Sequence, residues 1–397
     1  MHDFARWETK NAVPARDRLN PKELMSAALR RSRRARFSDS SFVEPLERLV
    51  CAYENEADLS DFGRAAARFD VLRCLSNQLR FDEAEDEDPA IVQRPIGQPL
   101  FITGLPRSST TFLHTLLAHD PNNAVPRCWE LIYPYPWRPR LLGLDFRRSW
   151  VELQFRIFKL LSPGVARLHP LAADTPQECT DITAQVFQSL RFDTTHYIPS
   201  YQRWFDAHGH RDAFRFHRRF LQHLDAQAPG RRWVLKSPDH VFALDAILET
   251  YPDARIVFLH RDPLSVVASC AKLTELLRRP FTRRLDPRVV GRQVADRLIE
   301  SAERMTAESG ARNGRILHLH YRDVVSAPMA AVSAIYGHCG FELDECSRKG
   351  MQGWLARRRH HRRVRYELSE FGLDPGRLRE SFARYMDAFS VPRETAA

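Results

Sequence analysis

Long apolar runs are missing from this sequence, and so are paired cysteines. Its longest apolar stretches, such as residues 256–259, fall far below the roughly 18 to 20 residues that cross a bilayer, and no signal-like apolar core follows Met1. The seven cysteines form an odd set without a CxxC pair, which suits a reducing compartment and argues against a structural zinc site. No metal-ligand set is visible. We therefore expect a cytoplasmic protein with no transmembrane segment and no metal centre.

The composition is that of a folded protein with an excess of basic residues. Of the 397 residues, 43% are hydrophobic and 28% are charged, which excludes disorder of the whole chain. At about 150 residues per domain, the length allows two or three domains or one large α/β domain. The 60 Lys and Arg against 50 Asp and Glu give a net charge of +10. Such an excess favours a polyanionic partner, whether nucleic acid, a membrane surface or a phosphorylated small molecule.

Helical spacing of apolar residues dominates the first part of the chain, up to about residue 81. Residues 82–88 include six acidic side chains, and Pro89 follows, so we expect neither a helix nor a central strand to continue there. These features predict a helical N-terminal region of residues 1–95 and an α/β domain of residues 96–397.

Short apolar runs followed by turn residues and a helical pattern predict buried parallel strands. The predicted strands are Leu100 to Thr103, Trp233 to Leu235, Ile256 to Leu259 and Ile316 to Tyr321. Between the first two lie about 130 residues rich in aromatics and proline, which strand–helix alternation cannot absorb. We expect residues 131–230 to form a mostly helical insertion that covers the sheet and shapes a substrate pocket. The predicted fold is therefore α/β, with a central parallel sheet flanked by helices.

A strand, a tight turn and the start of a helix follow one another between Pro99 and Leu117. A strand leading into a helix N-terminus directs unpaired N–H groups and the positive end of the helix dipole at one place, which suits a phosphate. One cation and four hydroxyls stand there: Arg107, Ser108, Ser109, Thr110 and Thr111. A single hydroxyl would suffice to cap the helix, so four of them after Gly-x-x-Arg favour a phosphate loop over a simple cap.

This loop is not a Walker A motif. Aligned on Gly104, that motif would need Gly at position 109 and Lys at position 110, where the chain has Ser109 and Thr110. The strand of residues 256–259 also leads into His260 and not into the acidic residue that holds magnesium in the usual P-loop site. A magnesium-dependent, P-loop nucleotide-dependent kinase is therefore the alternative and not the favoured function.

Cations also end two later strands. Lys236 ends one strand, and a Ser-Pro pair then provides a helix cap and a first helical position. Arg261 ends the next strand, and Ser269 follows eight residues later, about two turns into the following helix. Because ligands bind at the carboxyl ends of parallel strands, we expect Lys236 and Arg261 to converge with Arg107 on one anion. A lysine in a surface loop is the alternative for Lys236.

Taken together, these elements resemble the sulfotransferase superfamily that uses 3′-phosphoadenosine 5′-phosphosulfate (PAPS). The nearest likeness is to the bacterial branch related to tyrosylprotein sulfotransferases, over most of residues 96–397. In this resemblance residues 107–111 are the 5′-phosphosulfate loop, although a glycine commonly stands in the family where this chain has Ser109. The resemblance implies a P-loop-like sheet, PAPS as the donor without a metal, and a small-molecule, lipid or carbohydrate hydroxyl as the acceptor.

The resemblance also assigns individual residues. Arg261 and Ser269 match the family's 3′-phosphate pair at its usual spacing, and residues 321–325 resemble a recurring segment that implies a place for Tyr321 near the nucleotide. Residues 236–238 resemble another recurring segment. We therefore expect Arg107, Lys236 and the hydroxyls and amides of Ser108 to Thr111 to neutralise the negative charge that grows on the transferring sulfuryl group and on the leaving phosphate.

A catalytic base is implied shortly after the first helix. Glu130 falls where the tyrosylprotein branch carries its catalytic glutamate, and Trp129 beside it would partly desolvate the carboxylate and raise its pKa. We therefore expect Glu130 to take the acceptor proton, the alternative being a surface glutamate in a loop. Three further candidates in the inserted region rank lower: His169, Glu178 and His196.

Two basic clusters, Arg30 to Arg36 and Arg357 to Arg365, allow a nucleic-acid-binding protein as a further alternative. No recognition module accompanies them, so we expect no nucleic-acid partner. The first cluster fits a solvated helix face, and the second could close over the 3′-phosphate. Arg348-Lys349-Gly350 also resembles a tripeptide that binds this phosphate in cytosolic sulfotransferases.

The acceptor and the oligomeric state have no decisive signal in the sequence. Aromatic segments at residues 133–137 and 197–205 suggest an apolar or ring-bearing alcohol, and packing is the alternative for them.

Overall fold

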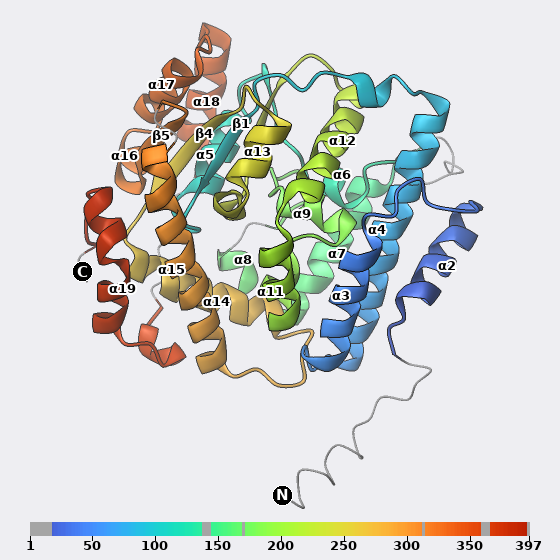
Figure 1. Ribbon diagram of the computed structural model, residues 1–397. Helices are drawn as coiled ribbons and strands as arrows, with labels where there is room; N and C mark the ends of the chain where they lie inside the picture. Colours follow the sequence, from blue (N-terminus) through green and yellow to red (C-terminus); the bar gives the residue numbers. More distant parts are fainter. Residues whose placement is uncertain (1–17, 137–143, 169–170, 312–313, 359–365, 395–397) are drawn as a thin grey trace, which may run out of the picture.

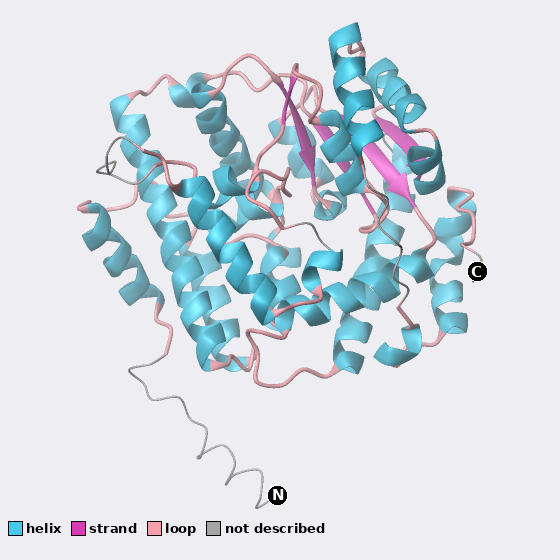
Figure 2. Cartoon of the chain, turned by 180° about the vertical axis from the view of Figure 1, so that it is seen from behind, coloured by secondary structure: helices cyan, strands magenta, loops and turns pink. Residues whose placement is uncertain are grey.

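A five-stranded parallel sheet, in the order β2-β3-β1-β4-β5, forms the centre of the computed structural model (Figures 1 and 2). The structure describes residues 18–136, 144–168, 171–311, 314–358 and 366–394. The strands are β1 (Leu100–Gly104), β2 (Asn123–Ala124), β3 (Arg232–Lys236), β4 (Arg255–His260) and β5 (Ile316–His320). All four predicted strands are confirmed, within about a residue at each end. The sequence did not predict β2, whose two residues are too few to form a pattern.

Successive residues of each strand pack into different hydrophobic cores. In β1, Leu100 and Ile102 belong to one core, whereas Phe101 belongs to the other. In β4, Val257 faces the first core and Phe258 the second. Because both faces of the sheet are covered, the strands have continuous apolar sequences instead of alternating ones.

Helices cover both faces of the sheet, as Figure 2 shows from behind. The smaller core is closed by α5 (Thr110–Leu117), α16 (Tyr321–Ser326), α17 (Pro328–Cys339) and α18 (Glu345–Arg357). The larger core includes α12 (Arg211–Gln227), α13 (Leu244–Thr250), α14 (Pro263–Arg278), α15 (Pro287–Ala311) and α19 (Pro375–Ala388). Short 3-10 helices lie at Ile91–Gln93 (η2), Ala184–Val186 (η4), Pro238–Phe242 (η5) and Leu368–Phe371 (η6).

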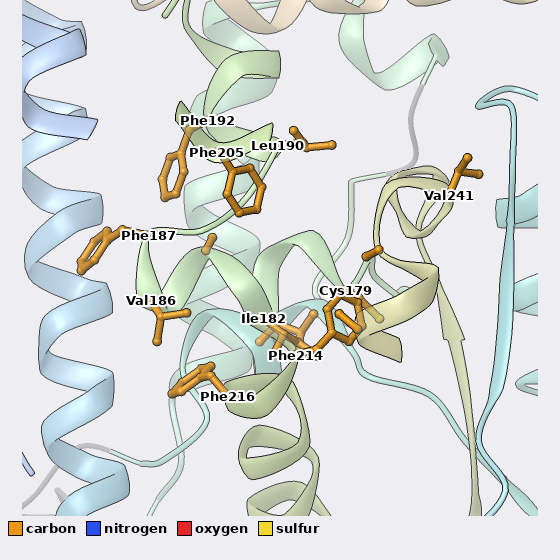
Figure 3. Packing of buried hydrophobic residues seen from close by; sticks show 14 of the residues in the cluster. Cys179, Ile182, Val186, Phe187, Leu190, Phe192, Phe205, Phe214, Phe216 and Val241 are labelled. Carbon is orange, nitrogen blue, oxygen red and sulfur yellow. The ribbon is translucent and has the colours of Figure 1, made fainter. Parts of the chain in front are cut away.

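The N-terminal region and the insertion are helical, as predicted. The N-terminal helices are α2 (Pro21–Ser32), α3 (Val43–Asn55) and α4 (Asp61–Glu87). The insertion contributes α6 (Cys128–Ile132), α7 (Arg147–Leu161), α8 (Val165–Leu168), α9 (Thr180–Thr183), α10 (Arg191–Thr195) and α11 (Pro199–His208), followed by α12. Side chains from the insertion, among them Ile182, Phe187 and Phe205, interlock in the larger core (Figure 3). The N-terminal helices share this core.

The acidic stretch before Pro89 does not end the helix, contrary to the expectation from its charge. Helix α4 continues to Glu87. Two of its carboxylates are neutralised by the same guanidinium, with Arg219 lying 2.8 Å from Asp82 and 2.5 Å from Glu85. Asp86 pairs with Arg34 at 2.8 Å. Tertiary ion pairs of this kind offset the repulsion that local sequence alone implies.

Within the described ranges, no helix is both long and apolar enough to cross a membrane.

Candidate active site

The loop after β1 has a strained backbone. Gly104 ends the strand at φ 124°, and a Cβ there would lie 2.3 Å from the carbonyl oxygen of Leu259, so only glycine fits. Arg107 and Ser109 also adopt positive φ, at 62° and 72°. The Ser108 hydroxyl donates a 2.5 Å hydrogen bond to the carbonyl of Leu105 and therefore closes the turn. The loop turns sharply and delivers the chain to the N-terminus of α5, which is the geometry of an anion-binding loop.

Ser109 stands at the N-cap of α5 in the left-handed region and makes no side-chain capping bond. We expect Ser109→Gly to stabilise the protein by about 1 kcal/mol, because glycine avoids the Cβ penalty of this conformation. Denaturant unfolding would measure the gain. Ser381→Gly in the middle of α19 is the control and should destabilise by about 0.5 to 1 kcal/mol. Equal losses in both variants would contradict a strained Ser109.

Four predicted nucleotide ligands come together at the carboxyl edge of the sheet. Arg107 donates from Nε to the Ser269 hydroxyl at 3.1 Å. Arg261 donates from Nη1 to the backbone carbonyl of Arg107 at 2.6 Å, and its guanidinium lies 4.2 Å from the centre of the Tyr321 ring. The ends of β1, β4 and β5 therefore meet with the second turn of α14 at one cationic patch.

A carboxylate from the C-terminal segment lies on this patch. Glu394 accepts two hydrogen bonds from Arg261, at 2.6 Å to Nε and 2.9 Å to Nη2, and its backbone N–H donates to Asp262 at 2.7 Å. The guanidinium is thus oriented for a two-pronged anion. Sequence reasoning missed Glu394, because 133 residues separate it from Arg261 and no motif marks the pair.

Lys236 is fully buried at the end of β3, so the surface-loop alternative is wrong for this residue. Its Nζ lies 2.5 Å from Oε1 of Glu178 and donates to the Thr111 hydroxyl at 3.4 Å. The ammonium therefore bridges the first turn of α5 and a carboxylate of the insertion. Ser237 caps η5 by accepting from the N–H of Asp239, as its place before Pro238 predicts.

A cavity of about 710 Å³ opens beside this group. Its polar wall includes Arg107, Thr110, Thr111 and Glu178. The rest of the lining combines apolar side chains of α4, α7, α14 and α15 with charged ones such as Asp70, Arg73 and Arg191. This volume lies within the range of roughly 300 to 1,000 Å³ that is typical of small-molecule sites.

Glu130 does not lie in this cavity, contrary to what its predicted role as base requires. Cys128 and Ile132, four residues apart on α6, line the cavity, and Glu130 lies between them on the opposite face of the helix. Its Oε2 accepts from the N–H of Arg127 at 2.8 Å, and the side chain lines a separate 80 Å³ pocket beside Trp233. Burial raises the pKa of Glu130, which is the expected direction. The carboxylate, however, lies on the side of α6 that faces away from the main cavity.

The three lower-ranked candidates for the base differ in where they lie. Glu178 lies in the cavity in contact with Lys236, whereas His169 lies outside the described residues. His196 also lines the cavity, where burial lowers its pKa to about 3, and its Nδ1 contacts the Thr195 hydroxyl at 2.9 Å. Of the two candidates that the structure describes, Glu178 is the one that contacts Lys236, which in turn contacts Thr111 of the loop after β1.

The second basic cluster is described only in part, because residues 359–365 lie outside the described ranges. Arg358 packs on the ring of Phe112 at 4.2 Å, close to the start of α5. The tripeptide of residues 348–350 lies on α18, where Lys349 pairs with Glu345 at 3.4 Å. Arg358 therefore takes part in packing against α5, and Lys349 takes part in an ion pair at the surface.

Several charged residues of the cavity were not found from the sequence. Burial and the negative charge of Glu178 raise the pKa of Asp239 to about 7. Asp70 bridges Arg73 at 2.7 Å and Arg191 at 2.5 Å, and all three line the cavity. Asp239 follows Lys236 by three residues, which was an available signal, whereas the ion-paired group joins α4 to the insertion and has no local pattern.

A parallel sheet with a sharply turned loop after β1 and with cations at the ends of β3 and β4 is the arrangement that the sequence resemblance implied. The model of the sulfotransferase family matches residues 99–345, so the chain belongs to the sulfotransferase family and is an enzyme of that class. Family membership sets aside the kinase and the nucleic-acid-binding protein as its principal function.

Particular relatives are mycobacterial sulfotransferases. The chain is 24% identical over 282 residues to omega-hydroxy-beta-dihydromenaquinone-9 sulfotransferase Stf3 of Mycobacterium bovis and of Mycobacterium tuberculosis, covering 68% of this chain and 70% of the relative. The crystal structure of STF1 from M. tuberculosis H37Rv superposes with a TM-score of 0.81 at 29% identity, over 92% of this chain and 99% of that one. STF9 from Mycobacterium avium superposes with a TM-score of 0.81 at 27% identity, over 96% and 98%.

Proposed function

We propose that this enzyme transfers the sulfuryl group of PAPS to the hydroxyl of an apolar acceptor held in the 710 Å³ cavity. The observation that carries this proposal is the contact of Arg261, Ser269 and the loop residue Arg107 at the carboxyl edge of the sheet. Two anionic groups of one nucleotide can be held there, one by the loop and one by Arg261 with Ser269. The seven free cysteines fit a reducing compartment such as the cytoplasm.

Several groups at the carboxyl edge of the sheet would bind the donor. The amides at the start of α5, the hydroxyls of Thr110 and Thr111 and the cations Arg107 and Lys236 would hold the 5′-phosphosulfate. Arg107, Thr110 and Thr111 line the cavity, and the buried Lys236 contacts Thr111 from behind, so negative charge that grows on the sulfuryl oxygens and on the leaving phosphate would meet fixed positive charge. Their orientation before the reaction means that little reorganisation is needed when the charge develops.

Glu178 is the proton acceptor in this proposal. The acceptor oxygen attacks sulfur, the bond between sulfur and the phosphate oxygen breaks, and the hydroxyl proton passes to the Glu178 carboxylate. The products are a sulfate ester and 3′-phosphoadenosine 5′-phosphate. Glu178 is favoured over Glu130 because its Oε1 contacts Lys236 at 2.5 Å and its side chain lines the cavity.

The walls of the cavity support an apolar alcohol as the acceptor. Leu273 and Leu277 of α14 line this space together with Phe155 and Phe158 of α7. Against this part of the lining a carbohydrate would leave hydroxyls without hydrogen-bond partners. The relative Stf3 is named for a menaquinone derivative, a hydroxylated lipid. We therefore place this chain's acceptor among lipid alcohols of that kind.

Replacing Arg261 tests the donor assignment. Charge-assisted hydrogen bonds contribute roughly 1.5 to 3 kcal/mol each, so Arg261→Ala is expected to weaken 3′-phosphoadenosine 5′-phosphate binding by about tenfold to a hundredfold. Adenosine 5′-phosphate, which lacks the 3′-phosphate, should lose little affinity. Calorimetry with both nucleotides measures the difference.

Glu394→Gln is the matched control, because it removes the ion pair with Arg261 but keeps the guanidinium. This variant should bind the 3′-phosphorylated nucleotide at least as tightly as the original chain, since no carboxylate then competes for Arg261. If Arg261→Ala weakens both nucleotides equally, or if Glu394→Gln reproduces its effect, Arg261 has a structural role and the donor assignment fails.

A further inference from the structure

We propose that the exposed apolar face of α7 docks on an anionic lipid bilayer and that the acceptor alcohol enters the cavity from that bilayer. The entry of the acceptor rests on the proposed function, whereas the docking does not. Helix α7 lies within the insertion and forms one wall of the cavity. Three features of the surrounding surface support this proposal: an apolar stripe, an apolar rim and an excess of basic charge.

The apolar stripe runs along the solvent side of α7. Leu153, Ile157 and Leu160 occupy positions i, i+4 and i+7, which place them on one face of a helix. All three are exposed, and Leu160 is 80% exposed. A contiguous set of large exposed aliphatic side chains indicates a surface that is covered by an apolar partner.

The stripe is continuous with the mouth of the cavity. Five large apolar residues line the cavity and are also 42 to 51% exposed: Phe62, Phe69, Trp150, Ile157 and Leu161. They come from α4 on one side and from α7 on the other. The ring of Phe281 stacks on Phe62 and on Phe158, at 5.9 Å in each case, and joins the two sides. An apolar chain could therefore pass from a bilayer into the cavity without crossing a polar rim.

The charge around this rim favours an anionic surface. Helix α7 and the segment of residues 278–284 together carry eight basic residues and one acidic residue, Glu152. Arg147 and Arg278 are buried, and five of the other six basic residues are exposed: Arg148, Arg156, Arg279, Arg283 and Arg284. Arg148 pairs with Asp174 and Arg279 with Glu275, but both arginine side chains stay more than half exposed. Exposed pairs of this kind are weak and can exchange for lipid phosphates. A second copy of the chain on the same face would set basic against basic residues across a two-fold interface, so a bilayer is the better occupant.

Vesicle flotation without any nucleotide tests the docking. The probes are phosphatidylcholine vesicles with and without phosphatidylglycerol. The original chain should bind the anionic vesicles more tightly, and Leu160→Glu should weaken that binding at least tenfold. Leu160 does not line the cavity, so sulfation of a short, water-soluble alcohol should stay unchanged in this variant. Sulfation of a long-chain alcohol embedded in anionic vesicles should fall in step with binding.

Val92→Glu is the control, because Val92 is also an exposed aliphatic residue, lies on η2 away from this rim, and undergoes the same change of charge. It should bind vesicles as the original chain does. Equal weakening by both variants, no vesicle binding by the original chain, or a dimer in solution that Leu160→Glu dissociates would overturn the proposal. Normal docking with no sulfation of any alcohol would instead contradict the proposed function alone.

Discussion

Replacing Glu178 by glutamine is expected to lower kcat by about a hundredfold to ten thousandfold, the usual contribution of a positioned general base. Glutamine keeps the size of the side chain and an oxygen that can accept from Lys236, but it cannot take the acceptor proton. Nucleotide affinity should change little, because the amide still fills the space beside Lys236. Turnover and nucleotide binding measured on one preparation separate the two effects.

Glu130→Gln is the matched variant for this experiment. Its carboxylate caps α6 through the N–H of Arg127 and lies outside the main cavity, so we expect turnover within a few-fold of the original enzyme. The opposite pattern, with turnover lost in Glu130→Gln and kept in Glu178→Gln, would restore Glu130 as the base. Loss of nucleotide binding together with turnover in Glu178→Gln would mean that Glu178 organises the donor site.

Glu178 lines the main cavity and Glu130 does not, and this difference shows which features of the site the sequence could predict. The strands were predictable because burial on both faces makes each one an apolar run. The loop after β1 was predictable because its cation and hydroxyls are consecutive. The face of a five-residue helix such as α6 is not fixed by its own sequence. It depends on tertiary contacts, here those that turn Cys128 and Ile132 toward the cavity and Glu130 away.

Ion pairs between residues that are distant in sequence could not be predicted either, because they too depend on tertiary contacts. The contact of Glu178 with Lys236 spans 58 residues and that of Arg261 with Glu394 spans 133, so no local pattern records either. The end of α4 shows the same limit, because its acidic last turns look unfavourable until Arg219 is placed between Asp82 and Glu85. Motifs at strand ends therefore predicted which residues meet at one edge of the candidate site, whereas the contribution of the insertion depends on contacts that only the three-dimensional structure shows.

Lys236→Met is expected to lower kcat by about a hundredfold to a thousandfold, as removal of one fixed donor to a developing charge usually does. Methionine keeps a flexible apolar stem of similar length in a fully buried position but removes the ammonium beside Thr111. The nucleotide should also bind more weakly, because Lys236 faces the 5′-phosphosulfate in the proposed complex. Lys272→Met is the control, since Lys272 is also ion-paired, to Glu275 at 2.9 Å, but lies outside the cavity.

Combining Lys236→Met with Glu178→Gln tests whether the two residues act together. The two side chains are in direct contact, so their effects on kcat should not add, and the double variant should lose less than the product of the two single losses. Removing Lys236 alone also takes away a cation that contacts Glu178, so this single variant disturbs the base together with the electrostatic donor. Strictly multiplicative losses would show that the two groups act independently, and full turnover by folded Lys236→Met would remove Lys236 from the mechanism.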